Sequence, residues 1–172
     1  MVSCRIKPIY SFLEYLQGGT EINCTIAIDF TGEISTFFHV YFHCFHYLLS
    51  LFYYAASNGD PNQPQSLHYL GAPFTLYEQA LSAVGQIIED YDTDKQFPVL
   101  GFGARLPPNG VVSHEFHVNF SADNPYCNRV GGVLAAYRSC LSSIQLYGPT
   151  NFAPCIRHVA KFAQQYVSDI AF

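Results

Sequence analysis

The chain has 172 residues, of which 49% are hydrophobic and only 12% are charged. This length suits one domain with a sizeable core, and this composition excludes an intrinsically disordered chain. The formal net charge is -5 at pH 7, with 8 Lys and Arg residues scattered along the sequence. Because a nucleic-acid-binding surface needs clustered basic side chains, the sequence predicts no nucleic-acid partner.

The amino-terminal residues and the cysteines both indicate a cytoplasmic protein. Residues 1–19 contain no continuous apolar stretch before a small-residue cleavage site, so they do not resemble a secretory signal. The 6 cysteines are widely spaced and form no CxxC pair, which predicts free, mostly buried thiols. They are Cys4, Cys24, Cys44, Cys127, Cys140 and Cys155.

The apolar pattern predicts strands and helices in alternation. Residues 23–29 are rich in β-branched side chains, which is typical of a buried strand. Thr75 stands at the start of an amphipathic helix over 75–91 and is expected to cap it. Further along the chain we expect strands over 97–104 and 111–120, and helices over 131–141 and 152–167. This alternation favours an α/β domain with a parallel sheet and helices on both faces.

Asp29 ends the strand predicted over 23–29, and Thr31 follows two positions later. The open end of such a strand is where α/β folds place ligands. A carboxylate beside a hydroxyl supplies the hard oxygen ligands that Mg²⁺, Mn²⁺ and Ca²⁺ prefer. The same residues also fit a structural role, in which Asp29 caps the following turn through its side chain.

An apolar segment over 32–55 interrupts the sequence just after this loop. If residues 27–31 are joined to 56–61, they read AIDFT-ASNGDP, which places Ser57 two positions after Thr31 in a continuous Asp-x-Thr-x-Ser loop. The segment contains no Lys or Arg and is dense in Phe, Tyr and Leu.

Three interpretations fit the segment 32–55. Its length and apolarity would permit a membrane-spanning helix over 34–57, although basic flanks are missing. At helical spacing, His39, His43 and His46 would share one face, as in a metal or haem site. Back-translation favours the third interpretation, a translated intron. The codons at both ends can carry splice-site consensus bases, and the Leu- and Tyr-rich run can encode a pyrimidine tract.

The remainder of the chain contains an ordered series of distinctive motifs. They include YSFLEYLQGG at 10–19, SNGDP at 57–61, SLHY at 66–69, FPVLGFGA at 97–104, VSHEF at 112–116 and LYGPTNF at 146–152. These motifs resemble the von Willebrand factor A-type domain of copines. The resemblance implies a doubly wound, mostly parallel α/β sheet with helices on both faces, here partial, spanning 1–172 and interrupted at 32–55.

The resemblance also implies a metal-ion-dependent adhesion site. By analogy, Asp29, Thr31 and Ser57 would form its first loop, and Thr150 would supply the hydroxyl of its second loop. The third metal loop of the family follows a later strand, which this sequence does not reach before Phe172. We therefore expect Mg²⁺ or Mn²⁺ to bind weakly, and we expect the edge of the strand ending at Asp29 to lack its second neighbour.

The function implied by the resemblance is that of a non-enzymatic interaction module. No Gly-x-Ser-x-Gly elbow and no plausible pairing of nucleophile and base appears in the sequence. Copines resemble calcium-dependent phospholipid-binding proteins whose A-type domain binds intracellular proteins. A cytoplasmic protein with association to the plasma membrane is therefore expected, with Ca²⁺ and phospholipid as partners of the full-length family. The alternative is a membrane protein anchored by residues 34–57.

Overall fold

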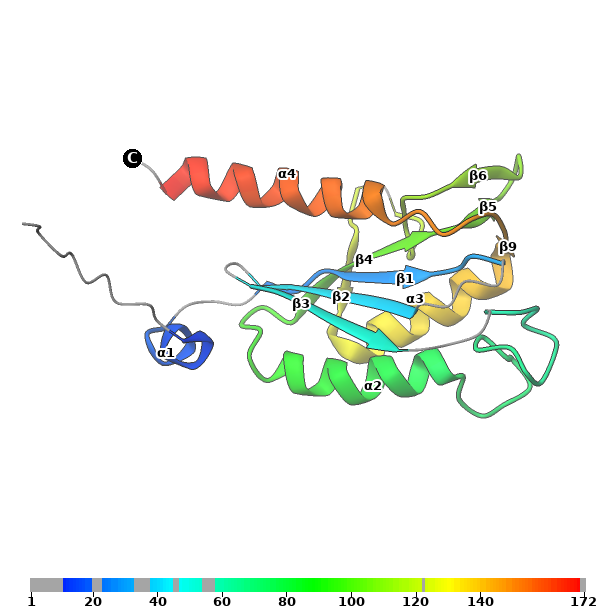
Figure 1. The fold of residues 1–172 in the computed structure, drawn as a ribbon, viewed down its shortest axis with the longest axis horizontal. Coiled ribbons are helices and arrows are strands. Elements are labelled where there is room, and N and C mark those ends of the chain that lie inside the picture. Colours follow the sequence, from blue (N-terminus) through cyan, green and yellow to red (C-terminus); the bar gives the residue numbers. More distant parts are fainter. Residues whose placement is uncertain are drawn as a thin grey trace, which may run out of the picture.

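The computed structural model describes residues 11–19, 23–32, 38–44, 47–53, 58–121 and 123–170. Figure 1 shows a layered arrangement in which β-strands lie between helices. Helix α4 lies on one side of strands β1 and β4, while helices α2 and α3 lie on the other side. Helices on both faces of a sheet agree with the α/β class that the sequence predicts.

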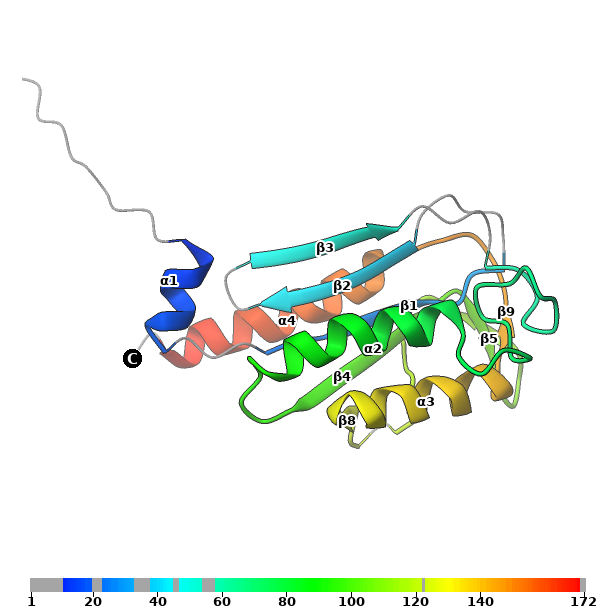
Figure 2. The ribbon, with the colours of Figure 1, turned by 90° about the horizontal axis from the view of Figure 1, so that it is seen from below.

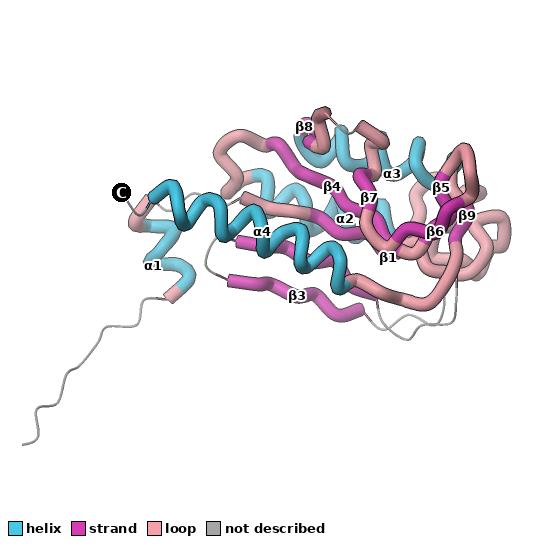
Figure 3. Tube along the Cα trace, turned by 90° about the horizontal axis from the view of Figure 1, so that it is seen from above, coloured by secondary structure: helices cyan, strands magenta, loops and turns pink. Residues whose placement is uncertain are grey.

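The helices are α1 (Phe12–Gln17), α2 (Leu76–Glu89), α3 (Arg129–Ser143) and α4 (Ala153–Ile170). The strands are β1 (Ile26–Asp29), β2 (Phe38–Cys44), β3 (Tyr47–Tyr53), β4 (Gln96–Phe102), β5 (Ala104–Leu106), β6 (Val111–Ser113), β7 (Phe116–His117), β8 (Tyr126–Asn128) and β9 (Gln145–Leu146). The colouring of Figure 3 separates the two kinds of element. The strand expected over 111–120 is two short strands, because the chain turns where the Ser113 hydroxyl donates to the Glu115 carbonyl.

The main sheet has the strand order β1-β4-β7, with β8 also paired to β4. Strands β1 and β4 are parallel, whereas β7 and β8 are both antiparallel to β4. A second sheet, β6-β5-β9, is antiparallel throughout. The described strands therefore do not confirm the expectation of a doubly wound, mostly parallel sheet. The chain reaches β7 and β8 through loops and short strands, and an antiparallel neighbour does not need a helical crossover.

Successive side chains of β1 and β4 point to opposite faces of the sheet, so they belong to two different hydrophobic clusters. Ile26, Ile28 and Val99 belong to the larger cluster, which α2 and α3 cover. Ala27 and Leu100 point to the opposite face, where Cys155 of α4 packs against them. Because both faces are covered, every residue of β1 is buried.

Helix α2 begins at a complete capping box, as the sequence predicts for Thr75. The Thr75 hydroxyl accepts from the Glu78 backbone N–H at 3.0 Å, and the Glu78 carboxylate accepts from the Thr75 N–H at 2.7 Å. The same carboxylate pairs with Arg138 of α3, with 2.8 Å between Oε1 and Nε. The cap therefore fixes the start of α2 and also joins α2 to α3.

The apolar segment forms strands in its described parts, not a helix. Strands β2 and β3 pair as an antiparallel hairpin, with Phe38 opposite Tyr53 and Cys44 opposite Tyr47. The alternative of a membrane-spanning helix over 34–57 is therefore wrong for these residues, since dense Phe and Tyr side chains also suit strands. No helix in the described part of the chain is long and apolar enough to cross a membrane. The translated-intron interpretation concerns the message and stays a prediction.

The hairpin lies next to strand β1. In Figure 2, β1 runs between β4 on one side and β2 on the other, and the backbones of β1 and β2 approach closely. The only ladder partner of β1 among the described strands is β4. The edge of β1 that was expected to lie open therefore has the hairpin beside it.

Candidate functional site

The candidate site begins at the carboxyl end of β1, with Asp29 and Thr31. Oδ1 of Asp29 accepts from the Thr31 backbone N–H at 2.8 Å and from the Thr31 hydroxyl at 2.7 Å. Asp29 is 1% exposed and Thr31 is fully buried. The turn-capping role considered from the sequence is therefore present, and it uses only one of the two carboxylate oxygens.

Thr150 completes the cluster from the other end of the chain. It lies in the loop between β9 and α4, and its hydroxyl oxygen is 3.2 Å from the hydroxyl oxygen of Thr31. Three of the four residues expected to hold a metal, Asp29, Thr31 and Thr150, therefore lie together. The fourth, Ser57, lies outside the described residues.

The second carboxylate oxygen of Asp29 has no hydrogen-bond partner in the described part of the chain. Oδ2 is buried, and nothing among those residues donates to it. Burial raises the pKa of Asp29 to about 6, although the hydrogen bonds from Thr31 and the nearby Asn58 side chain oppose this rise. A buried, unpartnered carboxylate oxygen costs free energy unless a proton or a cation satisfies it. This is the observation by which the cluster fits a hard divalent cation.

Asn58 fixes the backbone that carries these side chains. Its amide nitrogen donates to the carbonyl oxygens of Asp29 and Thr31, at 3.3 Å and 2.9 Å respectively. Its amide oxygen accepts from the Tyr77 hydroxyl at 2.9 Å. The amide of Asn58 therefore connects α2 to the loop between Asp29 and Thr31.

A second polar chain reaches Asp29 through His68. Nε2 of His68 lies 3.0 Å from the Asp29 carbonyl oxygen, which can only accept, so Nε2 carries the hydrogen. Nδ1 then accepts from the Tyr137 hydroxyl at 2.7 Å, and that hydroxyl is 3.1 Å from the Thr75 hydroxyl. Burial lowers the pKa of His68 to about 3, so the ring stays neutral.

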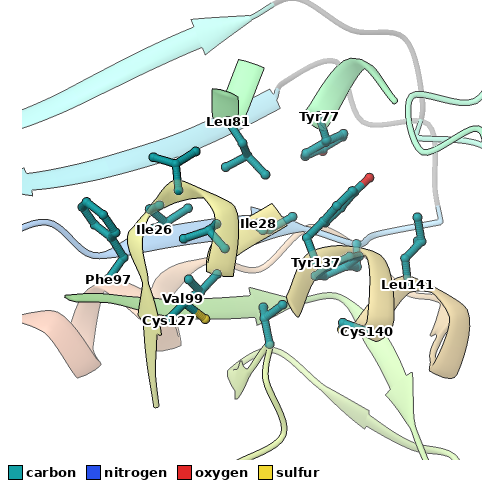
Figure 4. Packing of buried hydrophobic residues seen from close by; sticks show 14 of the residues in the cluster. Ile26, Ile28, Tyr77, Leu81, Phe97, Val99, Cys127, Tyr137, Cys140 and Leu141 are labelled. Atoms are coloured by element: carbon teal, nitrogen blue, oxygen red, sulfur yellow. The ribbon is translucent and has the colours of Figure 1, made fainter. Parts of the chain in front are cut away.

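Aromatic stacking holds this polar chain in place. The His68 ring stacks on Tyr77, with 4.0 Å between ring centroids, and on Phe30 at 5.5 Å. Tyr77 and Tyr137 lie on the same side of the sheet, as Figure 4 shows, and their centroids are 6.1 Å apart. The buried polar groups around Asp29 are therefore enclosed by packed rings, which keeps their geometry fixed.

Gly103 allows the backbone after β4 to approach Thr31. Its φ is +76°, and a Cβ atom at this position would overlap the Thr31 side chain and lie 3.0 Å from the Thr31 Cα. Any other residue would therefore displace Thr31 or strain the backbone.

Sequence patterns indicated no role for five of the residues around the site: Asn58, His68, Tyr77, Tyr137 and Gly103. His68 and Gly103 lie in the segments SLHY and FPVLGFGA, which carried the family resemblance. Their contacts depend on tertiary packing, so no local pattern reveals them. The side chains of His39 and His43 are not described, and His46 lies outside the described residues.

The donor set is dominated by hydroxyl oxygen with a single carboxylate. Within the described ranges, no group of three or more His, Cys, Asp and Glu side chains is arranged to hold a metal. Cys127, Cys140 and Cys155 are free thiols and are buried, as expected, and Cys24 is buried as well. Oxygen ligands without imidazole or thiolate suit Mg²⁺ or Mn²⁺ better than Zn²⁺.

These features define an α/β domain with an aspartate–threonine loop at the carboxyl end of the buried strand β1. The family model for Copine matches residues 66–171, which is more than half of the chain. The chain therefore belongs to the copine family, as the sequence motifs indicated. The match begins after the apolar segment 32–55, so it includes Thr150 but not Asp29 or Thr31.

Proposed function

We propose that Asp29, Thr31 and Thr150 hold a divalent cation, Mg²⁺ or Mn²⁺, and that the chain is a non-enzymatic protein-interaction module. The observation that carries the proposal is the buried Asp29 Oδ2, which has no partner among the described residues. The two threonine hydroxyls, 3.2 Å apart, supply further oxygen beside it. A cation there would satisfy the carboxylate and keep it ionised.

The number of protein ligands favours an interaction site. One carboxylate and two hydroxyls leave coordination positions of a divalent ion for water or for an external ligand. An acidic side chain of a partner protein is the ligand that such a position would take, since it brings a hard oxygen and a negative charge. In the membrane-associated family, the phospholipid contact would come from other parts of the full-length proteins.

The polar chains around Asp29 support a preformed site. Asn58 and His68 both donate to the Asp29 carbonyl oxygen, so the loop is held by α2 and α3 and does not depend on the ion. A preformed loop lowers the free-energy cost of ordering the ligands when the cation binds.

Calorimetric titration of the purified chain with MgCl₂ and MnCl₂ tests the proposal. Asp29→Asn keeps an acceptor for Thr31 but removes the charge, and it should abolish the binding isotherm. Asp92→Asn is the matched control, because Asp92 is 3% exposed and its Oδ2 is also buried without a partner among the described residues. It lies after α2, outside the cluster, and should leave binding unchanged.

Two results would reject the cation site. One is a wild-type chain that is folded by circular dichroism but gives no heat with either cation. The other is an Asp29→Asn variant that binds both cations like the wild type.

A further inference from the structure

His117 and His158 face each other on the side of the sheet that α4 covers. His117 belongs to β7 and His158 to α4. Their ring centroids are 6.0 Å apart, and the ring planes are nearly perpendicular at 88°. Both rings line a hollow of about 70 Å³, together with Cys24 and Tyr126. Neither histidine belongs to the cluster around Asp29.

Each of the two rings has its Nδ1 bound to an oxygen that can only accept. Nδ1 of His158 is 2.6 Å from the Glu115 carboxylate, and Nδ1 of His117 is 3.0 Å from the Ser121 carbonyl oxygen. Both Nδ1 atoms therefore carry a hydrogen, and in the neutral rings the lone pair is on Nε2. This is the tautomer in which a histidine binds metal through Nε2, with its other nitrogen oriented by a carboxylate or carbonyl.

The two rings are close enough for one ion to bridge them after a small movement. At the usual Zn–N distance, an imidazole centroid lies about 3.2 Å from the metal, so two rings at the tetrahedral angle have centroids about 5.2 Å apart. The observed separation is 6.0 Å, so the rings would move slightly closer on binding the ion. Perpendicular ring planes avoid a clash between the two ligands.

We propose that His117 and His158 form a two-histidine site for a transition-metal dication such as Zn²⁺, separate from the cation site at Asp29. Glu115 and the Ser121 carbonyl orient the two rings. No third His, Cys, Asp or Glu joins them within the described part of the chain, so water completes the coordination. Imidazole nitrogen selects Zn²⁺, Cu²⁺ or Ni²⁺ over Mg²⁺, so the two sites take different classes of ion.

Nitrogen NMR of the histidine side chains during a ZnCl₂ titration tests this proposal on the full chain. The Nε2 resonances of His117 and His158 should shift together and saturate at one equivalent. His117→Gln and His158→Gln should each weaken Zn²⁺ binding at least about tenfold, because one ligand cannot chelate. Glu115→Gln should weaken it about tenfold through the orientation of His158.

Three controls separate this site from other zinc ligands. His114→Gln removes a histidine of the same segment and should leave the affinity unchanged, as should Cys24→Ser, which removes the thiol beside the hollow. Asp29→Asn should also bind Zn²⁺ normally, so a failure of the cation site at Asp29 would not affect this result.

Two outcomes would overturn the proposal. The first is a titration of the wild-type chain in which neither Nε2 resonance shifts, or in which only one of them shifts. This outcome can be observed without making any variant. The second is a Cys24→Ser or His114→Gln variant that loses binding while His158→Gln retains it.

Discussion

The hydroxyl oxygens of Thr31 and Thr150 lie 3.2 Å apart, although 119 positions separate the two residues in the chain. Thr31 follows strand β1 and Thr150 precedes α4, so the contact joins the loop after β1 to the loop between β9 and α4. Oδ1 of Asp29 accepts from the same Thr31 hydroxyl at 2.7 Å. The cluster is therefore assembled by the fold and held by hydrogen bonds before any ion is bound.

Replacing Gly103 by alanine should lower the free energy of unfolding by more than the strain of its left-handed backbone alone explains. Gly103 and Gly110 both have positive φ, +76° and +65°, but only Gly103 packs against Thr31, while nothing lies within 4 Å of a Cβ at Gly110. Gly110→Ala should cost about 1 kcal/mol from its left-handed backbone. Gly103→Ala should cost roughly 3 kcal/mol, because overlap with Thr31 adds to the same term. Urea unfolding of both variants measures the difference, and equal costs would refute the role of this contact.

Asp29→Asn should stabilise the cation-free chain near neutral pH. The pKa of Asp29 is raised to about 6 when folded, against about 3.9 when unfolded. The folded state therefore binds this proton more tightly, and stability is lost as pH rises from about 4 to about 6. At about pH 7.5 the variant should exceed the wild type by an amount of order 2 kcal/mol, and near pH 4 this advantage should disappear. Urea unfolding at both pH values checks this; a pH-independent difference would contradict it.

Tyr137→Phe should leave His68 with an unsatisfied nitrogen. The Tyr137 hydroxyl is the donor to the buried Nδ1 of His68, at 2.7 Å. Its removal should lower the free energy of unfolding by about 1–3 kcal/mol, the cost of a buried polar atom without a partner. Tyr147→Phe is the control, since Tyr147 is 40% exposed and its ring still accepts the Arg105 guanidinium. That change should stay within about 0.5 kcal/mol. Chemical denaturation that ranks the two variants equally would argue against the polar chain.

Deleting residues 32–55 should strengthen cation binding and promote self-association. The deletion removes the segment that the translated-intron interpretation assigns to an intron, and it places Ser57 two positions after Thr31. One more hydroxyl ligand should raise Mn²⁺ affinity about tenfold, which corresponds to ~1.4 kcal/mol. The deletion also removes β2 from beside β1, and an open strand edge recruits other strands. Mn²⁺ titration and analytical ultracentrifugation measure the two effects. A monomeric deletion variant with wild-type affinity would contradict both expectations.

Local patterns predicted the elements better than their pairing. The β-branched run before Asp29 and the helix cap at Thr75 are local signals, and both appear where expected. The partner of a strand is a tertiary choice, and β7 therefore turned out antiparallel to β4. The same holds for the apolar segment 32–55. Its hydrophobic periodicity could not distinguish a membrane helix from the hairpin of β2 and β3.

The predicted site residues came from the family resemblance together with the chemistry of their side chains. An aspartate at a strand end is a local signal, so Asp29 and Thr31 could be chosen from the sequence. Only the family motif pointed to Thr150, which the fold brings to Thr31. No sequence signal showed that His68 would be buried against the Asp29 carbonyl, since that contact requires α2, α3 and β1 to pack together.

The most direct measurement is the titration of the Asp29 carboxyl group by carbon NMR, with and without Mg²⁺. Without the cation, this buried group should titrate with a pKa of about 6. With saturating Mg²⁺ the carboxylate should stay ionised to a pH well below that value, because an ion at Oδ2 stabilises the charged form. A titration midpoint that is the same in both conditions would contradict the cation site.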